Sequence, residues 1–169
     1  MPKHLIFFRH GKSDWGANFS CDHDRPVAER GRRAAQTMGR WLAATPWVPD
    51  LAITSSAVRA KTTLDLAMTA GSWACPTQVT DDLYEATVAA VLGVIHPQPE
   101  IFTTLMLVGH EPTWSDTLID LMGGGTVRLP TAAMACLRFE EDRWTQVGQG
   151  RGTLLWLMPP KLLTAVTLP

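Results

Sequence analysis

The alternation of short apolar segments with helix-forming segments most constrains the fold of this chain. Three apolar runs are bounded by charged or turn residues, as buried strands are, and they lie at residues 4–8, 50–54 and 104–108. Each run precedes a segment with apolar residues on one helical face, and these segments lie at residues 29–44, 57–68 and 112–122. Ser55 and Ser56 stand where an N-cap of the second helix belongs. Strands that alternate with helices indicate an α/β fold with parallel strands.

The remaining segments extend this pattern. A short strand is predicted at residues 77–80 and a helix at 86–95. Beyond the three glycines at 123–125, β structure is predicted, over residues 132–139, 143–147 and 153–157. No repeat or linker interrupts the chain. We therefore predict one domain, residues 1–169: a three-layer α/β/α sandwich built around a largely parallel sheet.

Composition excludes several classes of protein. The 169 residues are 46% hydrophobic and 18% charged, which is typical of a folded chain and not of a disordered one. The formal net charge of −1 lacks the basic excess of a nucleic-acid-binding protein. No apolar segment reaches the length of a membrane-spanning helix, and no signal-peptide core follows Met1. Three widely spaced cysteines favour a reducing compartment, so we expect a cytoplasmic protein that contacts neither membrane nor nucleic acid.

Unusual residues follow each of the three apolar runs. The first run ends in Arg9 and His10, the second is followed by a segment containing Arg59, and the third ends in Gly109 and His110. The carboxyl ends of parallel strands lie at one edge of a sheet, where open α/β sheets bind ligands. Two arginines and two histidines gathered there would bind a dianionic phosphoryl group.

The two histidines suit different roles. A neutral imidazole can act as a nucleophile near pH 7, and His10, beside a glycine that permits close backbone approach, is the better candidate for attack on phosphorus. His110, at the start of a helix, would donate a hydrogen bond to the transferred group. Each motif alone is weak evidence, since a Gly-His-x-Pro segment is more often a turn. Their occurrence together, each after an apolar run, is what favours a phosphate site.

These motifs resemble those of the histidine phosphatase (phosphoglycerate mutase-like) superfamily. Residues 8–15 (FRHGKSDW) resemble its Arg-His-Gly signature. Residues 22–27 (DHDRPV) and 30–35 (RGRRAA) resemble the D-x-x-R-P-L…G-x-x-x-A segment of its small branch, the SixA-like phosphohistidine phosphatases. Residues 55–63 (SSAVRAKTT) are similar to the S-x-x-x-R-A-x-x-T pattern of that branch, and residues 107–112 (LVGHEP) to its G-H-x-P segment. The matches follow the family's order and cover most of the chain.

The resemblance implies a phosphoglycerate mutase-like fold and a role for each matching residue. His10 would be the phosphorylated nucleophile, and Arg9, Arg59 and His110 would complete the phosphate pocket. Arg25 would lie at the rim of the pocket, although a surface ion pair with a neighbouring aspartate is an equal alternative. Ser13 would either donate a hydrogen bond to a phosphate oxygen or cap a turn.

The proton donor is assigned from the same resemblance. Relatives place a carboxyl group between the S-x-x-x-R-A helix and the G-H-x-P segment, and Glu85 falls in that interval, with Asp82 as the next candidate. Glu85 could instead simply begin the predicted helix at residues 86–95. A nitrogen leaving group, as in phosphohistidine, can be protonated without strong help from the enzyme, so activity would not depend on this acid.

Other residues are expected to be structural. His4, His23 and His96 are predicted to be non-catalytic, whereas Trp15 and Trp114 are close enough to the site loops in sequence to line its rim. No group of His, Cys, Asp or Glu has metal-ligand spacing, so neither a metal nor another cofactor is predicted.

The resemblance therefore implies a metal-independent phosphatase that acts through a phosphohistidine intermediate, with a phosphorylated substrate as its partner. Protein phosphohistidine is the expected substrate. Two alternatives stay open at this point: hydrolysis of small phosphomonoesters, and a non-catalytic module on the same fold that binds phosphate or phosphopeptides.

Overall fold

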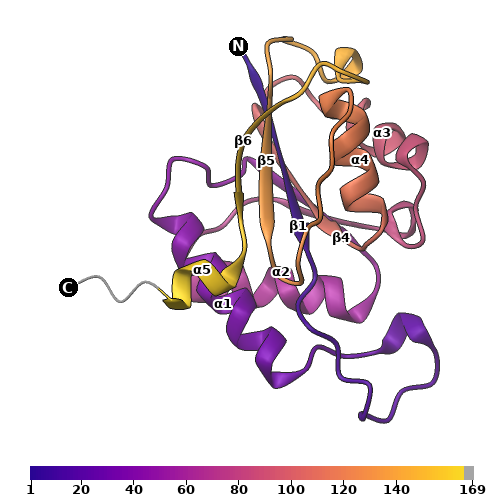
Figure 1. Ribbon diagram of the computed structural model, residues 1–169, viewed down its shortest axis with the longest axis vertical. Helices are drawn as coiled ribbons and strands as arrows, with labels where there is room; N and C mark the ends of the chain where they lie inside the picture. The colour runs from indigo at the N-terminus through magenta and orange to yellow at the C-terminus, as the bar shows by residue number, and fades with distance from the viewer. Residues whose placement is uncertain (166–169) are drawn as a thin grey trace.

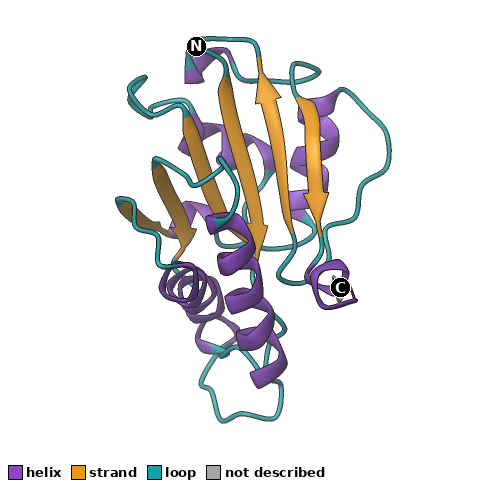
Figure 2. Ribbon diagram, turned by 90° about the vertical axis from the view of Figure 1, so that its left-hand side faces the viewer, coloured by secondary structure: helices purple, strands orange, loops and turns teal. Residues whose placement is uncertain are grey.

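The predicted strands form the centre of one mixed six-stranded sheet in the computed structural model, which describes residues 1–165 (Figure 1). The strands are β1 (Lys3–Arg9), β2 (Leu51–Ser55), β3 (Thr77–Thr80), β4 (Thr104–Gly109), β5 (Met134–Phe139) and β6 (Thr153–Met158). Their order across the sheet is β3-β2-β4-β1-β5-β6. The first four strands in this order are mutually parallel, and β5 and β6 add an antiparallel edge beside β1 (Figure 2).

Helices cover both faces of the sheet. They are α1 (Glu29–Ala43), α2 (Val58–Gly71), α3 (Val88–Ile95), α4 (Thr113–Met122) and α5 (Pro160–Ala165). One core cluster joins the sheet to α3 and α4, and the other joins it to α1, α2 and α5. This is the predicted three-layer α/β/α sandwich. Within residues 1–165, no helix combines the length and apolar character that crossing a membrane requires.

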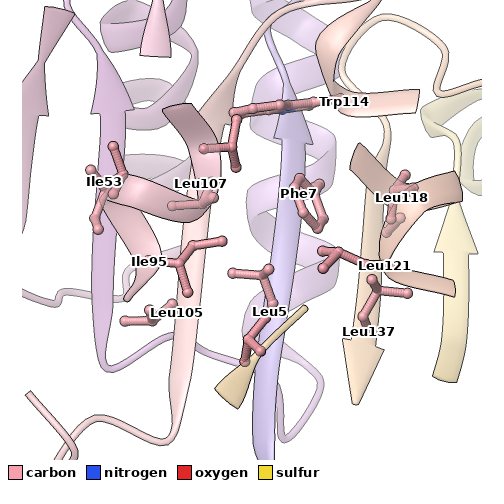
Figure 3. Packing of buried hydrophobic residues seen from close by; sticks show 14 of the residues in the cluster. Leu5, Phe7, Ile53, Ile95, Leu105, Leu107, Trp114, Leu118, Leu121 and Leu137 are labelled. Atoms are coloured by element: carbon pink, nitrogen blue, oxygen red, sulfur yellow. The ribbon is translucent and has the colours of Figure 1, made fainter. Parts of the chain in front are cut away.

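The alternation of side chains along β1 explains why both layers are needed. Leu5 and Phe7 point to the face covered by α3 and α4, where Phe7 packs edge-on against Trp114 (Figure 3). Ile6 and Phe8 point to the opposite face, toward α1 and α2. All four side chains are fully buried. A central strand that is apolar on both faces can be covered only by a layer on each side.

Three details of the prediction are wrong. The strand expected at residues 143–147 is a 3₁₀ turn (Trp144–Gln146), because Trp144 is buried and its indole Nε1 donates to the carbonyl of Phe102 at 3.0 Å. The helix expected from residue 86 begins at Val88, after Thr87 accepts a capping hydrogen bond from the Ala90 amide at 3.2 Å. Helix α5, which follows Pro159, was not predicted.

Contact between α1 and α2 depends on Gly39. A Cβ at this position would lie about 2.0 Å from the carbonyl oxygen of Ala67 in α2, so no side chain fits between the two backbones. We expect Gly39→Ala to lower the free energy of unfolding by about 2–4 kcal/mol. Gly93 in α3 is the matched control, because a Cβ there meets no atom within 4 Å. Gly93→Ala should raise stability by about 0.5–1 kcal/mol. Urea denaturation of both variants checks this, and equal effects would contradict the packing argument.

The topology brings the three motif-bearing junctions together. Strand β1 lies between β4 and β5, with Arg9 opposite Gly109, and β2 pairs with the other side of β4, with Thr54 opposite Val108. The carboxyl ends of β1, β4 and β2 are therefore adjacent at one edge of the sheet. The loops that carry His10, His110 and Arg59 begin at this edge.

Candidate active site

His10 is held by backbone hydrogen bonds immediately after β1. Its amide donates to the carbonyl of Gly109 at 3.0 Å, and its carbonyl accepts from the Ala132 amide at 3.1 Å. The ring Nδ1 lies 2.7 Å from the carbonyl oxygen of Gly11. A carbonyl can only accept, so Nδ1 carries the proton and Nε2 keeps its lone pair. The bond thus presents His10 as a neutral imidazole with a free nucleophilic nitrogen.

The protonation state of His10 supports the same arrangement. The side chain is only 8% exposed. Burial lowers the pKa of His10 to about 4; the bond to Gly11 opposes this shift, while the positive charges of Arg59 and Arg9 add to it. The imidazole is therefore neutral near pH 7.

We expect an NMR titration to show this low pKa directly. The Cε1 proton of His10 should keep its shift from about pH 8 to pH 5.5 and then titrate with a midpoint near 4. The neutral form, in which Nε2 has a free lone pair, loses population only as the pH falls through this value. The unfolded chain takes up its proton near pH 6.5, which means that the free energy of unfolding also decreases between about pH 6.5 and 4. A midpoint above 6 would contradict the structure.

Three arginines converge beside this ring. Arg9 donates through Nη1 to the carbonyl of Leu129 at 2.9 Å, and Arg25 and Arg59 both form ion pairs with Asp22, at 2.7 and 2.9 Å. Arg25 and Arg59 are 8% and 5% exposed. Partial burial raises the pKa of Asp22, but hydrogen bonds from Arg25 and Tyr84 and the charge of Arg59 outweigh it and lower the pKa to about 2. Asp22 thus holds two guanidinium groups in place while neutralising only one charge.

His110 lies across the site from His10, with ring centroids 5.1 Å apart. Its Nε2 lies 2.8 Å from the hydroxyl of Ser55, which also accepts a hydrogen bond from the Ala57 amide at 3.3 Å. Because this oxygen already accepts one hydrogen bond, we infer that the Ser55 hydroxyl donates its proton to Nε2 of His110. The ring proton of the neutral imidazole then lies on Nδ1. Burial and the neighbouring His10 and Arg59 lower the pKa of His110 to about 3. His110 is therefore a neutral donor whose orientation depends on Ser55.

This contact corrects the expectation that Ser55 or Ser56 caps α2. Ala57 occupies the N-cap position without a side-chain cap, and the hydroxyl of Ser56 lies 2.9 Å from Nε2 of His23 instead. The two serine hydroxyls therefore each contact a histidine ring, Ser55 that of His110 and Ser56 that of His23.

A cavity of about 240 Å³ lies among these groups. Four cationic side chains and one carboxylate line it, namely Arg9, Lys12, Arg25, Arg59 and Glu111. Several buried polar atoms have no partner among residues 1–165, and four of them belong to residues of this cavity: Nε of Arg9, Nε of Arg59, Nδ1 of His110 and Oγ of Ser13. Unpaired buried polar groups beside excess positive charge are the features that a site for a phosphoryl dianion requires.

A second cavity, of about 640 Å³, adjoins the first and shares Arg25, Arg59, His110 and Glu111 with it. Glu85 and Asp116 also line this larger cavity. Glu85 has a left-handed backbone, with φ of 49°, which is uncommon for a residue with a side chain. Burial raises the pKa of Glu111, against hydrogen bonds from Ser115. The larger cavity is thus the richer in carboxylates, since Asp22, Glu85, Glu111 and Asp116 line it, whereas Glu111 is the only one in the described lining of the smaller cavity.

The structure brings together most of the predicted site residues. Arg9, His10, Ser13, Arg25, Arg59 and His110 all line the smaller cavity, and Glu85 lines the larger one. Arg25 satisfies both interpretations, since it pairs with Asp22 and also lines the cavity. Asp82 does not line either cavity in the described part of the chain; its amide and carboxylate bond to Thr80.

The two tryptophans expected at the rim differ. Trp15 is 67% exposed and lies against the guanidinium of Arg25, with 3.7 Å from Cζ to the ring centroid. Trp114 is fully buried, so its expected place at the rim is wrong. Its indole Nε1 donates to the carbonyl of Phe8 at 3.0 Å, and its ring covers Gly109. Trp114 therefore supports the strand ends beneath the site.

The remaining histidines lie in different surroundings. His4 packs against Trp47, and Nε2 of His96 lies 2.9 Å from the carbonyl of Val147. His23 is closer to the site than expected, since its ring meets that of Tyr84 at 5.0 Å. Among residues 1–165, no group of three or more His, Cys, Asp or Glu is arranged to hold a metal ion.

Sequence reasoning missed the part that three residues play in organising the site: it gave Tyr84 no role, Ser55 only a helix cap, and Asp22 only a possible ion pair with Arg25. Each acts by contact with a residue distant in sequence, and Tyr84 donates from its hydroxyl to Asp22 at 3.0 Å. Only the place of Asp22 and Ser55 inside the quoted motifs could have indicated them.

Comparisons with known proteins agree with this geometry. The family model of the histidine phosphatase superfamily (branch 1) matches residues 5–99. An uncharacterized protein of Mycobacterium tuberculosis strain H37Rv is 35% identical over 163 residues, which cover 90% of this chain and 99% of that protein. A 2,3-bisphosphoglycerate-dependent phosphoglycerate mutase of Nitrobacter winogradskyi is 39% identical, but over only 38% of this chain and 32% of its own length.

Solved structures are similar over almost the whole chain. A candidate phosphohistidine phosphatase SixA from Agrobacterium tumefaciens is 27% identical, with a TM-score of 0.79 over 95% of this chain and 99% of that chain. A candidate SixA from Nakamurella multipartitia is 25% identical, with a TM-score of 0.81 over 94% and 97% of the two chains. The protein histidine phosphatase SixA in complex with tungstate, at 22% identity, shares the fold with a TM-score of 0.81 over 95% and 99%.

Proposed function

This chain belongs to the histidine phosphatase superfamily, and from that premise we propose that it is a metal-independent phosphatase that transfers a phosphoryl group first to His10 and then to water. The nucleophile is supported by the single contact that fixes its tautomer, the 2.7 Å bond from Nδ1 of His10 to the carbonyl of Gly11. A site that only bound phosphate would not need a free, neutral ring nitrogen aimed into a cationic cavity.

The reaction has two displacements at phosphorus. In the first, the Nε2 lone pair forms a bond to phosphorus while the bond from phosphorus to the leaving group breaks. Arg9, Arg25, Arg59 and the Nδ1 proton of His110 hold the phosphoryl oxygens and stabilise the charge that develops on them. In the second, water attacks phosphorus and the bond to Nε2 breaks, which releases inorganic phosphate and restores neutral His10.

Glu85 is the proposed proton donor to the leaving group, since together with His110 it lines the cavity of about 640 Å³, which we propose holds the leaving group and call the leaving-group cavity. In the second displacement, the carboxylate left after this proton transfer would accept a proton from the attacking water. A nitrogen leaving group needs this help less than an alkoxide does, because the nitrogen can take its proton from solvent.

The substrate class follows from the charges of the leaving-group cavity. Glu85, Glu111 and Asp116 line it, and the arginines at its border are partly neutralised by Asp22. Such a cavity repels a leaving group that carries its own carboxylate or second phosphate, and it accepts a neutral or cationic one, such as imidazole. We therefore propose protein phosphohistidine as the substrate. The similarity to candidate SixA phosphatases at 25–27% identity supports the same choice.

Competing substrates test this proposal. We expect kcat/KM for a phosphohistidine peptide to exceed that for 3-phosphoglycerate by roughly 100-fold, as like-charge repulsion of a few kcal/mol would produce. The Asp116→Asn variant, which removes a carboxylate from the cavity but keeps Glu85 as the proton donor, should narrow this gap by improving turnover of the anionic ester. Equal or better hydrolysis of 3-phosphoglycerate by the wild type would favour a small-molecule phosphomonoesterase instead.

A further inference from the structure

A third cavity lies outside the catalytic groups, between the first half of α1 and the C-terminal helix α5, which lie beside each other (Figure 1). This α1–α5 groove has a volume of about 780 Å³. It is formed by one face of α1, from Arg30 to Thr37, by Pro130 and Thr131 before β5, and by the segment from Pro159 to Thr164. No step of the proposed reaction uses it.

The groove is continuous with the phosphate site. Lys12 and Thr131 line both cavities, so the groove begins where the pocket around His10 ends. Glu85 and Asp116, which line the leaving-group cavity, line neither the groove nor the phosphate pocket. A substrate longer than one residue could therefore place its phosphoryl group against His10 and extend into the groove.

Charge in the groove is of one sign. Four cations line it, namely Lys12, Arg30, Arg33 and Lys161, and the described lining residues include no Asp or Glu. Glu29 is near Arg33, but the pair is 3.8 Å long and both side chains are more than 70% exposed, so it neutralises little. The groove therefore favours an anionic occupant.

The floor between these cations is apolar. Ala34, Pro130, Pro159, Pro160 and Leu162 form it, and Leu162 is 54% exposed in spite of its size. The described lining contains no aromatic residue on which nucleotide bases could stack. Apolar side chains alternating with carboxylates fit such a surface, which favours a polypeptide over a nucleic acid as the anionic occupant.

We propose that the α1–α5 groove binds an acidic polypeptide segment that flanks the phosphorylated residue of the substrate. The proposal rests on the proposed function, because it assumes that the phosphoryl group is carried by a protein. Carboxylates of the segment pair with Arg30, Arg33 and Lys161 while its apolar side chains cover the prolines and Leu162. Recognition of the flanking segment then adds to the affinity supplied by the phosphoryl group.

Binding of two peptides tests this without relying on turnover. Both carry a non-hydrolysable phosphonate analogue of phosphohistidine, flanked in one by Glu and Leu and in the other by Ser and Gly, and fluorescence anisotropy gives each Kd. We expect the acidic peptide to bind about tenfold more tightly at low salt, as two or three exposed ion pairs provide. The preference should shrink as salt is raised toward 1 M.

Charge reversal on α1 locates the effect. Arg30→Glu, Arg33→Glu should remove the preference, whereas Arg32→Glu, Arg40→Glu, which changes the same charge on a different face of the helix, should keep it. Hydrolysis of an aryl phosphate should be the same in all three proteins. Equal affinity for both peptides, or equal loss in the two double variants, would overturn the groove proposal. Preferential binding without hydrolysis of any phosphorylated substrate would leave the groove assigned and contradict the proposed enzyme.

Discussion

The His10→Ala variant should lose hydrolysis of an aryl phosphate by roughly 10⁴–10⁶-fold in kcat, because the chemical step has no other nucleophile. The contacts around the ring explain why no neighbour can substitute for it. The described part of the site places one other imidazole there, His110, and its Nε2 is occupied by Ser55 at 2.8 Å. The arginines stay protonated and have no lone pair to offer.

The controls for this variant separate chemistry from folding. His4→Gln changes a histidine at the amino end of β1, away from the site, and should keep wild-type activity. Far-UV circular dichroism of His10→Ala should match that of the wild type, since the loop is also held by its backbone bonds to Gly109 and Ala132. Wild-type turnover should persist in EDTA if the reaction needs no metal. Substantial activity in His10→Ala would refute the assignment of the nucleophile.

Loss of Arg59 should have the second largest effect. Its guanidinium is 5% exposed, and its Nε has no partner among residues 1–165. We expect Arg59→Ala to lower kcat/KM by roughly 10²–10³-fold, as removal of a preorganised donor to a developing charge does in other enzymes. Arg59→Lys keeps the positive charge but cannot form the bidentate hydrogen bonds of a guanidinium, so its kcat/KM should lie between those of Arg59→Ala and the wild type.

A second variant distinguishes the direct role of Arg59 from its structural one. Arg59 also fixes the loop at Asp22, through bonds to the carbonyl at 2.6 Å and to the carboxylate at 2.9 Å. Asp22→Asn weakens that loop contact but leaves the guanidinium in place, and it should cost only about tenfold. Steady-state kinetics of the three variants and of the exposed control Arg40→Ala provide the comparison. If Asp22→Asn were as damaging as Arg59→Ala, the arginine would act only by holding the loop.

The sequence predicted those parts of the fold that depend on local pattern. The apolar runs at residues 4–8, 50–54 and 104–108 became β1, β2 and β4 because central parallel strands must be apolar on both faces. The segment at 143–147 (RWTQV) has only two apolar residues, and Trp144 is held in the core by bonds to Phe102 and Glu100, more than 40 residues away in the chain. Periodicity cannot distinguish such a tertiary contact from a strand.

The candidate site likewise contains some residues that local sequence pattern predicts and others that depend on contacts between distant segments. Arg9, His10, Arg59 and His110 stand at strand ends, and the parallel topology was enough to predict that they meet. The distant partners that orient them were not predictable, because the bond from Ser55 to His110 and the ion pair of Asp22 with Arg59 join different loops. The pair of Asp22 with Arg25, three residues apart, is one of the two alternatives that the sequence leaves open for Arg25. Trp114 shows the opposite error, since closeness in sequence to His110 did not place its side chain in the cavity.

The covalent intermediate tests the central claim most directly. Wild-type protein mixed with a phosphorylated substrate is quenched in alkali, which preserves phosphohistidine, and peptides are mapped by mass spectrometry. We predict one phosphoryl group on the peptide that contains His10, absent when the substrate is omitted and absent from the His10→Ala variant. A phosphoryl group on any other residue, with equal labelling of His10→Ala, would contradict the account.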